Sequence, residues 1–146
     1  MSNYIQEIID NFDEDLTIKV SSPAAKWLFE TNEGAKKLKK DRVEYFGSIV
    51  AKILWVALRG RPDCGTAVSF LCTRVKNLDA DDWKKLQRLI CFMKQTINDD
   101  RVVGVDDLRH MQTFINSSHA VHDDMMGHTG GIITFGTGVV CIKMGK

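Results

Sequence analysis

Histidine and aspartate, two residue types that bind metal ions and transfer protons, are concentrated in one short part of this sequence. Five of them fall within ten residues, namely His119, His122, Asp123, Asp124 and His128. The cluster lacks the helical HExxH arrangement, and on a strand the rings of His119 and His122 would point to opposite faces. We therefore expect surface histidines and turn-forming aspartates here, and no metal site.

Basic side chains that could contact phosphate groups are concentrated in the middle of the chain. Residues 36–94 carry fourteen basic and six acidic side chains, a net charge of +8, whereas residues 1–35 carry −5 and residues 95–146 carry −2. The total of +1 therefore hides a basic middle. Six of these basic residues lie mainly away from the apolar stripes of the predicted helices: Arg74, Lys76, Lys84, Lys85, Arg88 and Lys94.

Two interpretations of this basic face are open from the residues alone. It can contact several phosphates without reading base sequence. It can equally be the solvated side of ordinary amphipathic helices. The four lysines between residues 36 and 40 are weaker evidence, because a flexible loop would carry them as well.

Apolar periodicity predicts the elements that position these residues. Helical spacing of apolar residues, with Asp79 as a cap for the last helix, predicts helices over residues 4–12, 43–58, 66–75 and 79–97. Short segments rich in β-branched and aromatic residues then predict strands over 113–115, 131–135 and 139–143, and the glycine-rich run 127–131 indicates a hairpin turn. The fold class is therefore α+β, a small helical subdomain followed by a three-stranded antiparallel meander that needs a cover on its apolar face.

Composition limits the class of protein further. With 146 residues, 44% of them hydrophobic and 27% charged, the chain has the composition of a globular domain. No window reaches the roughly 18 uninterrupted apolar residues of a membrane span, and the N-terminus lacks the charge order of a secretory signal. The four cysteines form no C-x-x-C pair, which disfavours a cysteine zinc site. We expect no membrane association and a location in the cytoplasm or the nucleus.

Five stretches of sequence, in a fixed order and spacing, carry a resemblance to a known family. They are residues 50–54 (VAKIL), 59–63 (RGRPD), 66–75 (TAVSFLCTRV), 81–86 (DDWKKL) and, within 118–138, AVH at 120–122 followed by GHTGG at 127–131. Over nearly its whole length the chain resembles the polyprotein of copia-type retrotransposons, from behind the reverse-transcriptase palm to the start of RNase H.

The resemblance implies three segments and a partner. Residues 1–34 would be a tail and connector leaving the palm, residues 35–100 a helical thumb or connection segment, and residues 101–146 a truncated RNase H-like sheet. The implied partner is an RNA–DNA or DNA duplex, bound weakly and without sequence specificity through the six basic residues of the middle segment. The rest of a retroelement polyprotein is the other implied partner.

The resemblance also implies what the chain lacks for catalysis. A reverse transcriptase needs a Tyr-x-Asp-Asp-type motif, which does not occur here. RNase H needs several carboxylates that hold two Mg²⁺ ions, and the family's first such aspartate falls at Asn116, whose amide carries no negative charge. The other carboxylates would follow Lys146. We therefore expect a partial, non-catalytic chain with no intact catalytic residue and no cofactor, Mg²⁺ belonging to the parent family.

Two alternative functions are kept. The chain could be a protein-interaction module derived from a retroelement, because open strand edges and an uncovered sheet face can recruit another chain. It could also be an RNase H-type nuclease.

Overall fold

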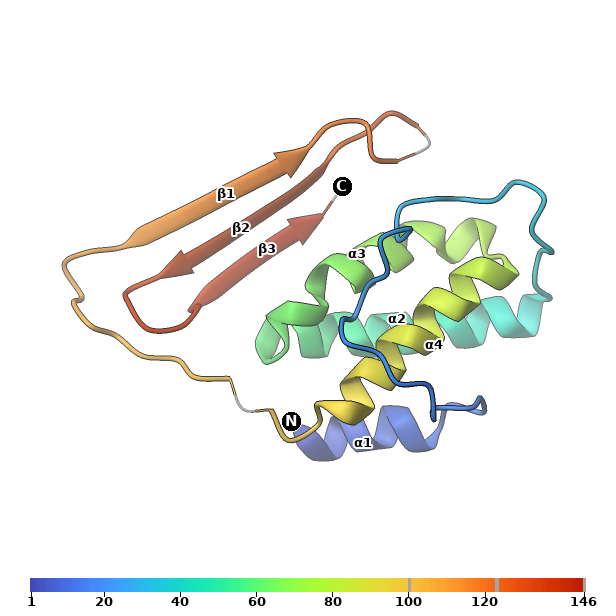
Figure 1. The fold of residues 1–146 in the computed structure, drawn as a ribbon, viewed down its shortest axis with the longest axis horizontal. Coiled ribbons are helices and arrows are strands. Elements are labelled where there is room, and N and C mark those ends of the chain that lie inside the picture. Colours follow the sequence, from blue (N-terminus) through green and yellow to red (C-terminus); the bar gives the residue numbers. More distant parts are fainter. Residues whose placement is uncertain (100, 123, 146) are drawn as a thin grey trace. The chain divides into compact units, whose positions relative to one another are not determined.

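The computed structural model describes every residue except Asp100, Asp123 and Lys146, and the chain forms two compact units. Residues 1–98 form a helical unit and residues 99–146 contain the sheet (Figure 1). The α+β class is confirmed, with four α-helices and one three-stranded antiparallel sheet in the described residues. The predicted boundary after residue 100 falls on a residue outside the described part.

All four predicted helices form, with shifted ends. Their bounds are α1 Ser2–Asp10, α2 Lys40–Arg59, α3 Gly65–Arg74 and α4 Ala80–Gln95, and short 3-10 turns lie on either side of α3 at Pro62–Cys64 and Val75–Asn77. Helix α2 begins three residues earlier than predicted, with Asp41 in its first turn, where a carboxylate is favourable. The helix ends at Gly60, as expected, and Pro62 two residues later could not have continued it.

The apolar stripes of these helices form the core of the helical unit. Trp83 on α4 stacks on Phe12, which follows α1, with 5.5 Å between ring centroids, and on Tyr45 of α2 at 6.1 Å. Burying one such aliphatic or aromatic side chain contributes about 1.5–3 kcal/mol. The largest fully buried side chains include Phe46, Ile53, Phe70, Leu71, Leu86, Leu89, Ile90 and Met93.

A buried arginine fixes the corner between α2 and α3. The Arg61 guanidinium donates to the Asp63 carboxylate at 2.7 Å, to the Thr96 carbonyl at 3.0 Å and to the Thr96 hydroxyl at 2.6 Å. It therefore ties this corner to the end of α4. Cys64 lies in the same corner, where burial raises the pKa of its thiol to about 12, and it is one of four free cysteines.

The second unit is an antiparallel meander in the order β1-β2-β3, with β1 at Gln112–Ser118, β2 at His128–Thr134 and β3 at Cys141–Gly145. Phe114 pairs with Ile132, which pairs with Ile142, so these three side chains share one face. Thr113, Ile133 and Cys141 are paired in the same way on the opposite face. Both faces are therefore partly apolar.

The predicted hairpin turn over residues 127–131 is wrong for most of that run. Only Gly127 precedes β2, and Gly130 and Gly131 lie inside the strand. A Cβ at Gly127 would collide with the Ser118 carbonyl, so this position requires glycine, whereas a Cβ at Gly130 would meet open space. The described residues between β1 and β2, 119–122 and 124–127, form the turn instead, with Ala120 and Met125 at positive φ.

We predict that Ile53→Ala lowers the free energy of unfolding by about 2–5 kcal/mol, because it leaves a cavity in the core. Ile53 has no exposed surface, whereas Leu58 on the same helix is 46% exposed. The matched control Leu58→Ala should lower the free energy of unfolding by less than about 0.5 kcal/mol. Urea unfolding followed by helical circular dichroism measures both, and equal effects would contradict the packing described for α2.

Candidate nucleic-acid interface

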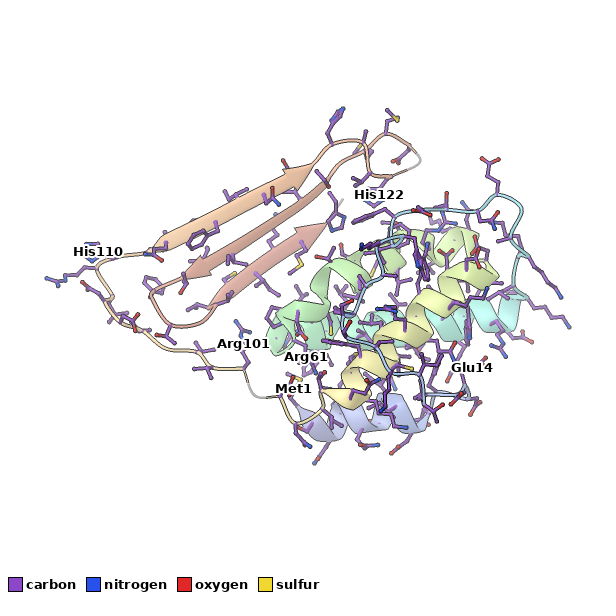
Figure 2. The ribbon with its side chains drawn as sticks, viewed as in Figure 1. Met1, Glu14, Arg61, Arg101, His110 and His122 are labelled. Carbon is purple, nitrogen blue, oxygen red and sulfur yellow. The ribbon has the colours of Figure 1, made fainter. Side chains whose placement is uncertain are left out.

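The chain between α1 and α2 lies along the polar side of α4. Gln87 donates to the Asp15 carbonyl at 2.7 Å, Gln95 to the Ile18 carbonyl at 2.8 Å and the Trp83 indole to the Glu14 carboxylate at 3.1 Å. Figure 1 shows this connector in dark blue crossing α4, and Figure 2 labels Glu14 where the connector begins. Part of the polar surface of α4 is thus used to bind the chain itself.

Two of the six predicted basic residues face this connector. The ammonium group of Lys85 donates to the Glu30 carbonyl at 2.6 Å and lies 4.7 Å from the ring centroid of Phe70, and the side chain is only 4% exposed. Arg88 is half-buried and donates to the Ser22 hydroxyl at 3.3 Å. Burial lowers the pKa of Lys85, because a charged ammonium loses hydration there.

Arg74 lies between two buried carboxylates. Its guanidinium is 3.0 Å from Asp82 and 3.3 Å from Asp79, and 14% of its side chain is exposed. Burial raises the pKa of Asp82, although the nearby Arg74 acts in the opposite direction. Much of the positive charge of Arg74 is therefore balanced inside the protein.

The other three predicted residues, Lys76, Lys84 and Lys94, are exposed. Lys84 is paired with Asp81 at 3.1 Å, a surface pair that constrains the lysine weakly. Lys84 and Lys94 are ten residues apart on α4, about 15 Å along the helix axis. The six residues consequently do not form one continuous face, since three point outward and three make contacts within the helical unit.

The lysine run before α2 is held against the start of α4. The Ala80 amide donates to the Lys36 carbonyl at 3.0 Å, the Leu38 amide donates to the Leu78 carbonyl at 3.3 Å, and Lys37 pairs with Asp79 in an isolated antiparallel bridge. The Lys37 ammonium also reaches the Asn77 carbonyl at 3.0 Å. The run is therefore a loop whose backbone is anchored by hydrogen bonds to the turn before α4.

This bridge brings the lysine run beside the turn that carries Lys76, a proximity that the sequence pattern does not predict. We call the resulting basic surface the lysine patch, and its members are exposed side chains from the run and from the turn before α4: Lys36, Lys37, Lys39, Lys40 and Lys76. The Lys40 side chain is 88% exposed, and its nearest acidic partner, Glu44, is 3.9 Å away. No periodicity pairs residues 36–38 with 78–80, and the opposite charges of Lys37 and Asp79, whose side chains lie 3.8 Å apart, are the signal that could have connected them.

Asn116 lies in the middle of β1, opposite Gly130 of β2, and is exposed. Gly130 is paired in turn with Met144 of β3, so Asn116 and Met144 lie on the same face of the sheet. Within the described residues, no group of three or more metal-ligating side chains is found. The side chain at this position can donate and accept hydrogen bonds but adds no charge to the sheet surface.

The described residues of the histidine cluster lie in the turn between β1 and β2 and at the first position of β2. His119 and Asp124 are exposed, and Asp123 lies outside the described residues. His122 and His128 are buried, so the prediction of surface histidines is wrong for this pair, and 3.3 Å separates His122 Nε2 from His128 Nδ1. None of the helices in the described part of the chain combines the length and apolarity that a membrane span requires.

We predict that Asp79→Ala lowers the free energy of unfolding by at least about 1–2 kcal/mol, because this carboxylate caps α4. It accepts hydrogen bonds from the Asp81 and Asp82 amides, both at 3.0 Å. The control Asp81→Ala removes a neighbouring carboxylate whose ion-pair partner is exposed. It should lower the free energy of unfolding by only about 0–1 kcal/mol. Denaturant unfolding compares the two, and an equal loss would show that the cap and its ion pairs contribute nothing specific.

Comparisons of the chain with family models, with curated proteins and with solved structures return no match.

Proposed function

We propose that this chain is a non-catalytic part of a copia-type reverse transcriptase and RNase H, and that it binds RNA–DNA or DNA duplex weakly and without sequence specificity. The observation that carries the binding proposal is the lysine patch, which gathers five exposed lysines from two separate parts of the sequence. A helical unit followed by an antiparallel meander agrees with the segment order that the resemblance implies. This activity belongs in the cytoplasm or the nucleus.

Lysine side chains suit this kind of binding. An ammonium on a flexible stem acts as a point charge that can follow the phosphates of a duplex, and it does not read bases in a fixed geometry. Neutralising phosphates releases counterions, so binding should weaken as salt rises. The exposed Lys84, one turn into α4, could extend the contact beyond the patch.

The buried members of the predicted basic face would support the patch indirectly. Arg74 and Lys37 both reach Asp79, at 3.3 Å and 3.8 Å. This carboxylate therefore helps to hold the lysine run beside Lys76. In this proposal Arg74, Lys85 and Arg88 keep the helical unit in shape, and the exposed lysines contact the duplex.

We predict that the triple variant Lys36→Gln, Lys39→Gln, Lys40→Gln binds a labelled RNA–DNA hybrid more weakly and with a flatter salt dependence. On B-form duplex each lost phosphate contact reduces the magnitude of the slope of log K against log salt by about 0.9, and we expect a reduction of that order on the hybrid. Fluorescence anisotropy over a series of salt concentrations measures both quantities.

The control for this experiment removes the same number of charges elsewhere. Lys19, Lys26 and Lys143 are exposed and lie outside the patch. Their combined change to Gln should leave most of the slope intact. Equal weakening by both triples would show that binding depends on total charge alone, and a wild-type chain without a salt-dependent shift would overturn the proposal.

We predict that the purified chain does not cleave an RNA–DNA hybrid in Mg²⁺, and that Asn116→Asp does not create cleavage. One restored carboxylate supplies one ligand, whereas a two-metal site needs several. Gel analysis of end-labelled hybrid tests both proteins. Cleavage by the wild-type chain would favour the nuclease alternative instead.

Protein interaction is the second candidate function, and the observation that favours it is strand β1. Every residue of β1 is exposed, including Phe114 and Ile115 at 55% and 75%. Among the described residues, no strand pairs with the outer edge of β1, so its backbone groups could pair with a strand of another chain. Such a partner would include the remainder of a retroelement polyprotein.

A further inference from the structure

Hydrogen bonds and unusual backbone angles constrain the described residues of the turn between β1 and β2. The His122 amide donates to the Met126 carbonyl at 3.2 Å, and the Met125 amide donates to the His122 carbonyl at 2.9 Å. Ala120 and Met125 adopt φ values of 51° and 61°, which non-glycine residues rarely do unless their surroundings hold them there. The Ser118 carbonyl leaves no room for a side chain at residue 127. These constraints hold the backbone of His122 in place.

Two histidines from opposite ends of this turn bring ring nitrogens together. His122 Nε2 lies 3.3 Å from His128 Nδ1, and the ring centroids are 5.5 Å apart with 39° between the ring planes. His128 is the first residue of β2 and pairs with Ser118, the last residue of β1. One histidine is thus held by the turn and the other by the sheet.

The separation of these two nitrogens matches that of two ligands on one metal ion. Zinc–nitrogen bonds of about 2.0–2.1 Å at a tetrahedral angle place the two nitrogens about 3.3–3.4 Å apart. The same distance also allows one ring to donate a hydrogen bond to the other when no ion is bound. Burial lowers the pKa of His128, and the neighbouring His122 lowers it further, so the neutral imidazole that binds metals is favoured.

We propose that His122 Nε2 and His128 Nδ1 form a two-histidine site for a divalent transition-metal ion such as Zn²⁺ or Ni²⁺, with water completing the coordination. The nitrogen ligands distinguish this site from an Mg²⁺ site, which uses oxygen ligands. A bound ion would join the turn to the start of β2. The proposal is independent of duplex binding, because it uses neither the lysine patch nor Asn116.

The first test is a Zn²⁺ titration of the intact chain, followed by nitrogen NMR of the four histidine rings. We expect His122 Nε2 and His128 Nδ1 to shift together and to saturate at one equivalent. His110 and His119 serve as internal references, since both are exposed and Figure 2 shows His110 and His122 at opposite ends of β1. No shift of the pair in millimolar Zn²⁺, or an equal shift of all four rings, would overturn the proposal.

The second test compares variants by calorimetric Zn²⁺ titration. His122→Gln and His128→Gln should each weaken binding at least about tenfold, since changes outside the ligand set already cost that much. His119→Gln is the matched control from the same turn and should bind as the wild type does. Cys141→Ser should also bind normally, and loss of binding in that variant would assign the ion to the exposed thiol and overturn the proposal.

Discussion

One buried carboxylate, Asp79, connects several parts of the helical unit. It is 1% exposed, and one of its oxygens caps α4 while the other approaches Arg74 and Lys37. A buried carboxylate is tolerated only if hydrogen bonds and positive charges replace the water it has lost. The three groups around Asp79 come from the start of α4, the end of α3 and the chain before α2. Satisfying this one charge therefore fixes where three separate segments meet.

The helices could be predicted because each carries a complete apolar stripe and a local start or stop signal. Residues at helical spacing in α2 and the Asp79 cap of α4 are examples that depend only on near neighbours in the sequence. The strands could be predicted because short segments rich in β-branched and aromatic residues are separated by turn segments. The turn between β1 and β2 was misplaced, because its positive φ values occur at Ala120 and Met125 and its glycines lie mostly in the strand.

The candidate site was harder to predict, because charge counts do not say which way a side chain points. Lys84 and Lys85 are adjacent in sequence, yet one is 68% exposed and the other 4%. The difference arises from the connector, which covers one side of α4 through contacts between residues far apart in the chain. The bridge between the lysine run and residues 78–80 could not be predicted for the same reason, since no local sequence signal marks it.

The connector along α4 also affects how the helical unit forms. Side-chain hydrogen bonds between the connector and α4 join residues 49 to 77 positions apart, as in the pairs Asn32–Asp81 and Gln95–Ile18. Contacts of such long sequence separation require a large loop to close before they contribute, which slows folding relative to a bundle with local contacts only. During synthesis the connector emerges well before α4, so α4 can dock only after about seventy further residues have been made. The connector can therefore pack in the helical unit only after α4 has been synthesised. A chain without residues 1–34 would expose the side of α4 that the connector covers.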